Sequence, residues 1–194
     1  MLLILAIALA LPSAVHAAST CPIGGGAVLE PAPQTCGVSD QYTLPLKPHV
    51  GCNTPRIPQC VENFLPLYKD FSEAELELAA QYMQMEAYES AVDSSPYFLA
   101  YNLERFLGGD QGLPFQLLLE GLMYDTARSY SDPVYMDNFF FEAVSAINRA
   151  SPEELQALYA IAAFTHLKTG DHEQAWHFFG LYSELGADPE FSAR

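Results

Sequence analysis

Three histidines and a glutamate in the C-terminal part of the chain have side chains that could bind a metal. His166, His172, Glu173 and His177 lie within 12 residues of one another. A zinc-binding helix of the protease type needs two histidines four residues apart, so that both face the metal. His172 and His177 are five apart, about 140° around a helix, and His166 precedes a turn at Gly170. The spacing favours structural roles, with His166 as a packing ring; a three-ligand site across the turn is the alternative.

The N-terminal end of the chain has the pattern of an export signal. Residues 2–11 are an unbroken apolar run, a Pro-Ser pair follows, and small residues precede Ala17. This pattern predicts a signal peptide over residues 1–17, with cleavage after Ala17 or Ala18. The run is shorter than the roughly 20 residues that span a bilayer, and an uncleaved anchor is the alternative. We therefore expect export through the secretory pathway, to the periplasm or outside the cell.

Four cysteines form the second set of reactive side chains. Cys21, Cys36, Cys52 and Cys60 all lie in a Pro- and Gly-rich stretch that carries few charges. An even number of clustered cysteines in an exported chain predicts disulfides. Four cysteines allow three pairings, and the spacing alone leaves them open. Four thiolates converging on zinc are the alternative, which an oxidising compartment disfavours.

The remaining reactive residues do not form a known catalytic pattern. The chain contains no Gly-x-Ser-x-Gly segment, no phosphate-binding loop and no calcium loop. Asp137 and Glu142 lie five residues apart in a very aromatic helical stretch and could become partly buried. We predict no catalytic residue, no metal and no cofactor.

The charge of the chain is strongly negative and unevenly distributed. The net charge is −16; the charges of residues 18–60 cancel, and residues 61–194 contain 22 acidic and 6 basic residues. Binding of nucleic acid or anionic lipid needs patches of Lys and Arg. The charge therefore excludes nucleic acid as a partner. It favours an acidic surface that keeps an exported protein soluble, with an acidic face for a basic partner as the alternative.

Helix start signals recur along the chain from residue 64 onwards. Ser72 and Glu75 have the spacing of a capping box, and Ser95, Asp132 and Ser151 each precede a proline of a first helical turn. From Pro96 onwards the starts fall at Pro96, Pro114, Pro133, Pro152 and Asp171, which are 18, 19, 19 and 19 residues apart, the length of one helix and one turn. A period of this kind predicts stacked helical hairpins. We expect an all-α fold of six helices, at residues 73–91, 96–107, 113–129, 133–149, 152–168 and 172–185.

The last of these hairpins resembles a tetratricopeptide repeat. That family alternates bulky and small residues so that two helices pack closely, and the matching positions here are Tyr159, Ala163, His166, Gly170, Ala175 and Phe179. The resemblance implies stacked antiparallel hairpins over residues 64–189. It also implies a partner-binding groove lined by the first helix of each hairpin. In the last hairpin that groove would contain Ala157, Ala160, Phe164 and Lys168.

A second resemblance covers residues 21–72. The segments CPIGGG and CVENFLPLYKDFS resemble a group of uncharacterised bacterial exported proteins that open with Cys-Pro-x-Gly-Gly. The resemblance implies that Cys21 and Cys60 form the shared disulfide, which leaves Cys36 and Cys52 as a nested second pair. It implies no activity. Independently of it, the Pro- and Gly-rich composition without helical periodicity predicts an irregular, disulfide-linked segment over residues 18–63.

The last predicted helix carries more apolar surface than one neighbouring helix can cover. Successive residues of a helix are about 100° apart around its axis, and on this scale the apolar residues, including Trp176, cover roughly 220°. A helix that packs on one side only needs an apolar stripe of a little over 100°. The residues of this arc are Ala175, Trp176, Phe178, Phe179, Leu181, Tyr182 and Leu185. After this helix only residues 186–194 follow, of which 190–194 form a tail beyond the expected domain, so no further helix is expected to cover it. Either the chain's own N-terminal segment covers the surplus, or another molecule does.

These observations favour a non-catalytic protein that binds another protein in the cell envelope or outside the cell. The expected partner-binding residues are Trp176 on the last helix and Ala157, Ala160, Phe164 and Lys168 on the helix before it. A homodimer is one form that such a contact could take. The alternative function is an enzyme, or a small-molecule or metal-binding protein, whose site lies between the N-terminal segment and the helices.

Overall fold

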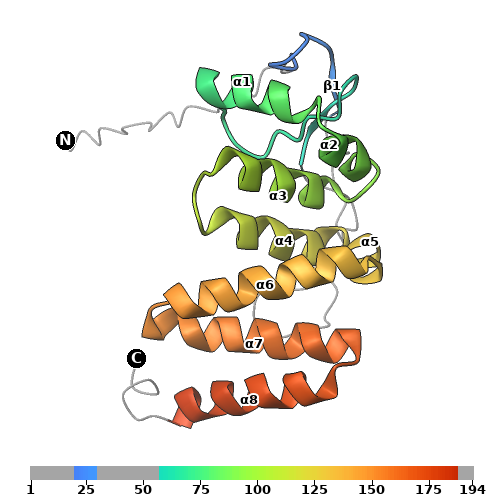
Figure 1. Ribbon diagram of the computed structural model, residues 1–194. Helices are drawn as coiled ribbons and strands as arrows, with labels where there is room; N and C mark the ends of the chain where they lie inside the picture. The colour runs from blue at the N-terminus through green and yellow to red at the C-terminus, as the bar shows by residue number, and fades with distance from the viewer. Residues whose placement is uncertain (1–19, 30–56, 188–194) are drawn as a thin grey trace, which may run out of the picture.

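The computed structural model describes residues 20–29 and 57–187, and these residues are mostly helical (Figure 1). Along the described chain the helices follow one another in sequence order from the end formed by α1 to the end formed by α8 (Figure 1). The elements are β1 (Val28–Leu29), β2 (Gln59–Cys60), α1 (Glu73–Tyr82), α2 (Glu86–Ala91), α3 (Pro96–Leu107), α4 (Leu113–Tyr124), α5 (Thr126–Ser131), α6 (Pro133–Arg149), α7 (Pro152–Thr169) and α8 (His172–Ala187). The expected signal peptide, Cys36, Cys52 and the tail lie outside the described residues.

Two of the expected helices are each divided in two. The helix expected at residues 73–91 ends at Tyr82 and resumes at Glu86. There the amides of Gln84 and Met85 bond to carbonyls three residues back, which tightens the last turn. The second helix, expected at residues 113–129, breaks at Asp125 between α4 and α5. Neither break coincides with a glycine or a proline, the residues that most strongly interrupt a helix.

The predicted capping residues do begin the helices. The Ser72 hydroxyl accepts a hydrogen bond from the Glu75 amide at 3.3 Å, and the Glu75 carboxylate accepts one from the Ser72 amide at 2.8 Å. Asp132 accepts from the amides of the first turn of α6 in the same way. α7 ends at Gly170, whose φ of 83° is the left-handed conformation that glycine adopts without strain.

A disulfide between Cys21 and Cys60 holds the described N-terminal segment. β1 and β2 pair antiparallel beside it, with Val28 opposite Cys60. The pairing of Cys21 with Cys60, implied by the second resemblance, is therefore confirmed. The rest of the described segment is irregular, so the disulfide and the short sheet fix its path.

Two groups of buried side chains form the core, and α3 contributes to both. Tyr97 of α3 packs in a cluster with Leu118 of α4 and with Tyr135 and Phe139 of α6. The second cluster joins Leu99 and Leu103, also of α3, to the disulfide, to Leu65 and to residues of α1 and α2. α3 thus attaches the disulfide-linked segment to the later helices.

Candidate interaction surface

The turn between α7 and α8 is closed by hydrogen bonds and a left-handed glycine. The Asp171 amide donates to the His166 carbonyl at 2.9 Å, and the Gly170 amide donates to the Leu167 carbonyl at 3.2 Å. Farther from the turn, a Cβ on Gly186 would lie 3.1 Å from the side chain of Gln156. The two hydrogen bonds fix where α8 begins relative to the end of α7, and the lack of a side chain at Gly186 lets α8 pass close to Gln156.

His166 is a packing ring, as its sequence context predicted. Its imidazole stacks on Phe140 of α6 at 4.0 Å between centroids and on Phe178 of α8 at 5.5 Å, so it joins three helices. Burial lowers the pKa of His166, although Asp171, whose carboxylate is 3.3 Å from Nδ1, acts in the opposite direction. His172 and His177 are exposed on α8. Within the described residues, no group of three His, Cys, Asp or Glu side chains is placed to hold a metal ion.

The side chain of Trp176 is 72% exposed on α8. Its ring meets Phe179 edge to face at 5.7 Å, and Phe179 stacks on Tyr182 at 6.1 Å. We call these three side chains the aromatic row. Phe179 is itself 48% exposed, whereas Ala175, on the side that faces α7, is buried. Because α8 is the last described helix, nothing in the described chain packs on its far side (Figure 1).

The four groove residues expected on α7 lie along one side of that helix. Ala157 and Lys168 are exposed, Phe164 is half-buried, and Ala160 is only 9% exposed. The Lys168 ammonium lies 5.4 Å from the centre of the Phe164 ring, a cation–π contact. The structure therefore brings Phe164 and Lys168 together and places Ala160 nearer the core.

Two exposed apolar features are not among the residues expected from the sequence. Leu167 of α7 is 52% exposed, close to the turn. On α6, Val134, Phe141 and Val144 are all at least half exposed. Their spacing of seven and three residues puts them on one side of the helix, so the helical period was the signal that could have found them.

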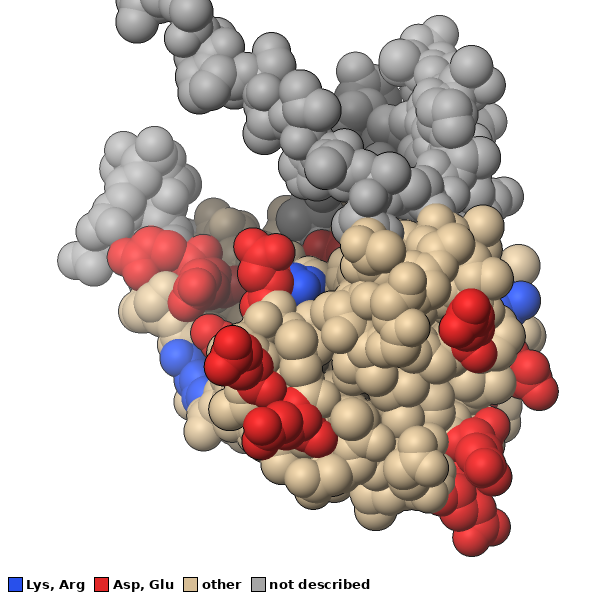
Figure 2. All heavy atoms as spheres, turned by 90° about the horizontal axis from the view of Figure 1, so that it is seen from above, with Lys and Arg blue, Asp and Glu red and all other residues tan. Residues whose placement is uncertain are grey.

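The two helices of the last hairpin, α7 and α8, are acidic in sequence. Residues 152–187 contain Glu153, Glu154, Asp171, Glu173 and Glu184, and Lys168 is their only Lys or Arg. Carboxylates also prevail over basic groups at the opposite end of the molecule, seen from above in Figure 2. A partner that covers this hairpin would therefore meet more carboxylates than basic groups on it.

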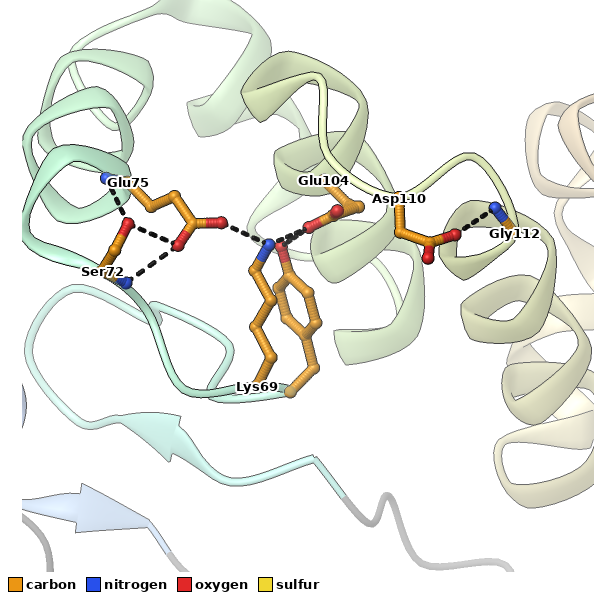
Figure 3. Close-up of polar contacts among 7 residues, drawn as sticks. Lys69, Ser72, Glu75, Glu104, Asp110 and Gly112 are labelled. Atoms are coloured by element: carbon orange, nitrogen blue, oxygen red, sulfur yellow. Dashed lines mark hydrogen bonds and ion pairs between the residues drawn. The ribbon is translucent and has the colours of Figure 1, made fainter.

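A buried ion pair joins the segment before α1 to α3 (Figure 3). Lys69 Nζ lies 2.7 Å from Glu104 and 2.7 Å from Glu75, and the Tyr68 hydroxyl donates to Glu104 at 2.7 Å. Burial, and then the hydrogen bond to Glu104, raise the pKa of Tyr68. Burial alone would lower the pKa of Lys69, but its hydrogen bonds to Glu104 and Glu75 raise it overall. Each of these groups is held by another, which is the arrangement of a structural clamp.

The carboxylate pair noted in the sequence is not a pair in the structure. Glu142 is buried, at 2% exposed, and lies 3.5 Å from Arg105 Nη1 of α3. Asp137 is exposed on the other side of α6. Burial is the largest cause that raises the pKa of Tyr101, and the charge of Glu142 adds to it. This arrangement offers no paired carboxylates for acid–base chemistry.

Among the described residues, no helix combines the length and apolar character needed to cross a membrane. Comparison of the chain with family models, with curated proteins and with solved structures gave no significant match to any of them.

Proposed function

We propose that this chain is an exported, non-catalytic protein of stacked, tetratricopeptide-like helical hairpins that binds another protein through the α7–α8 hairpin. The observation that carries the proposal is the exposed aromatic row on α8, of which Trp176 is the most exposed member. Exposed tryptophan is costly to leave in water and is enriched in the parts of interfaces that dominate binding.

The exposed area of Trp176 is large enough to matter energetically. A tryptophan buries about 150–250 Å² and apolar burial yields about 25 cal/mol per Å². Covering the 72% of Trp176 that is exposed would therefore contribute roughly 3–4 kcal/mol of apolar burial, from which the costs of association are subtracted. Phe179, which the Trp176 ring contacts, is itself 48% exposed and adds to this apolar surface.

The charges around the aromatic row select the kind of partner. Five carboxylates against one lysine in residues 152–187 disfavour an acidic partner and a second copy of this chain, whose net charge is −16. A segment with an apolar or aromatic anchor flanked by Lys or Arg complements both the row and its rim. The partner is thus a protein with an apolar, basic segment.

Export is supported by the disulfide and by the N-terminal sequence. A disulfide such as Cys21–Cys60 forms and persists in oxidising compartments. The apolar run at residues 2–11 has the pattern of a signal peptide. Both agree with a site of action in the periplasm or outside the cell.

Photo-crosslinking in the native host tests the proposal. A photoreactive amino acid replaces Trp176 in one variant and Glu77, an exposed residue of α1, in the control. We expect a discrete adduct to another protein from position 176 and none of that mass from position 77. Mass spectrometry of the adduct then identifies the partner and its crosslinked segment.

The other results of this experiment distinguish the alternatives. An adduct of twice the chain's mass would replace the proposal with a homodimer. A crosslink within the chain, from position 176 to its N-terminal segment, would show that the aromatic row is merely covered. The same adduct from both positions would refute a specific role of α8.

A further inference from the structure

A hollow at the N-terminal end of the molecule is separate from the surface on α7 and α8. It lies between the turn after β2 and the ends of α1 and α2 and has a volume of about 300 Å³. The residues that line it include Asn63, Phe64, Met83, Tyr88, Glu89 and Val92. This volume is at the lower end of the range of small-molecule sites, so it fits a compact ligand.

The turn that forms one wall of the hollow is fixed by several bonds. It follows Cys60, whose sulfur is linked to Cys21. The Asn63 side-chain amide donates to the Ile23 carbonyl at 2.9 Å, and the Tyr88 hydroxyl donates to the Asn63 carbonyl at 2.7 Å. The Phe64 amide donates to the Cys60 carbonyl at 2.9 Å. The wall therefore exists before any ligand binds.

Phe64 is an unusual residue for its position in this turn. Its φ of 58° lies in the left-handed region, which glycine and asparagine adopt readily and a bulky residue does not. Its side chain is 46% exposed, so core packing does not explain why a phenylalanine occupies this position. Strained residues of this kind cluster at binding sites. The ring of Phe64 is, moreover, part of the wall of the hollow.

The lining of the hollow has the chemistry of a cation site. It offers the aromatic residues Phe64 and Tyr88, the polarizable thioether of Met83 and the carboxylate of Glu89, and it contains no Lys or Arg. Aromatic faces attract ammonium groups, and a nearby carboxylate adds to that attraction. We propose that this hollow binds a small organic cation, an ammonium group carried on an apolar stem.

Methyl NMR on the intact, oxidised protein tests this binding directly. With methionine methyl groups labelled, Met83 reports from the hollow and Met136, buried on α6, is the internal control. Butyltrimethylammonium should shift the Met83 methyl signal saturably and leave Met136 unchanged. Hexanoate, of similar size and opposite charge, should shift neither. The absence of a Met83 shift with the cation, or an equal shift with hexanoate, would overturn the proposal.

Substitutions then separate binding from folding. Phe64→Asn suits the left-handed backbone, so we expect an unchanged or raised melting temperature and about tenfold weaker binding of the cation. Glu89→Gln should weaken binding severalfold, whereas Glu86→Gln, an exposed position of α2 outside the lining, should not. Wild-type affinity in Phe64→Asn, or equal losses at positions 86 and 89, would reject the site. These binding measurements are independent of the proposed partner: if position 176 gave no crosslink to another protein, the expected results for the hollow would be the same.

Discussion

At the scale of single residues, the two buried carboxylates are stabilised in different ways. Glu104 and Glu142 are 1% and 2% exposed, and burying a charge is costly unless it is paired and hydrogen-bonded. Glu104 has Lys69 and Tyr68 on one oxygen, whereas its other oxygen is buried without a hydrogen-bond partner, in the space that a Cβ at position 109 would occupy. Glu142 relies on Arg105, which is itself exposed. Glu104 is therefore the more completely enclosed charge.

Replacing Glu104 should destabilise the protein strongly. Glu104→Gln removes the charge that pairs with Lys69 and leaves that ammonium partly buried beside Glu75 alone. We expect the free energy of unfolding to fall by roughly 2–3 kcal/mol, since breaking a buried pair costs a few kcal/mol. Urea unfolding measures this loss. Glu77→Gln, an exposed carboxylate of α1, should change it by less than about 0.5 kcal/mol.

Glu75 gives the protein a specific acid sensitivity. The hydrogen bond from Lys69, with those from Ser72, lowers the pKa of Glu75 to about 2 from 4.5. Between these values the unfolded chain binds more protons, so stability rises with pH there and the contribution of Glu75 is complete above it. We expect Glu75→Gln to be less stable than the wild type at about pH 6, and the difference to be much smaller, though not yet zero, at about pH 2.5. Urea unfolding of both proteins at both pH values measures this. A difference in free energy of unfolding that is the same at the two pH values would contradict the prediction.

At the scale of secondary-structure elements, α4 approaches its neighbours too closely for a side chain at position 121. A Cβ on Gly121 would collide with the Tyr135 hydroxyl, which donates to the Leu118 carbonyl, and with Cβ of Tyr97. We expect Gly121→Ala to lower the free energy of unfolding by about 1–3 kcal/mol, because overpacking outweighs the better helix propensity of alanine. Gly180→Ala on α8, where the space is open, should instead raise it by up to about 1 kcal/mol. Chemical denaturation of both variants makes the comparison, and equal effects would contradict it.

Helix ends could be predicted from the sequence where capping residues determine them. Ser95, Asp132 and Ser151 begin α3, α6 and α7 at the expected positions, because a cap is a local interaction. The break between α1 and α2 could not be predicted in this way. There Tyr82 stacks on Phe106 of α3 at 4.8 Å, and Tyr88 bonds to Asn63. These contacts join residues far apart in the chain, and no local pattern reveals them.

The aromatic row and the hollow also differ in whether local sequence patterns reveal them. The aromatic row lies on one helix, so the helical period of the sequence is sufficient to single out Trp176. The hollow combines Phe64 of a turn with Met83 at the end of α1 and Glu89 of α2, and only the fold brings them together. The clamp of Lys69 and Glu104 is likewise non-local, at a separation of 35 residues. Patterns along one element can be recognised in the sequence, whereas sites between elements cannot.

At the scale of the whole molecule, the disulfide anchors a segment that has little secondary structure of its own. Cys21 and Cys60 are 39 residues apart, and both belong to the core cluster that contains Leu99 and Leu103 of α3. Closing a loop of this length restricts the unfolded chain by an amount worth about 4 kcal/mol. We expect the double variant Cys21→Ser, Cys60→Ser to lose about that much stability in urea while keeping most of its helical circular dichroism, because α3 to α8 have their own core. If the double variant instead lost its helical circular dichroism in the absence of urea, the disulfide-linked segment would be required for the helices to form.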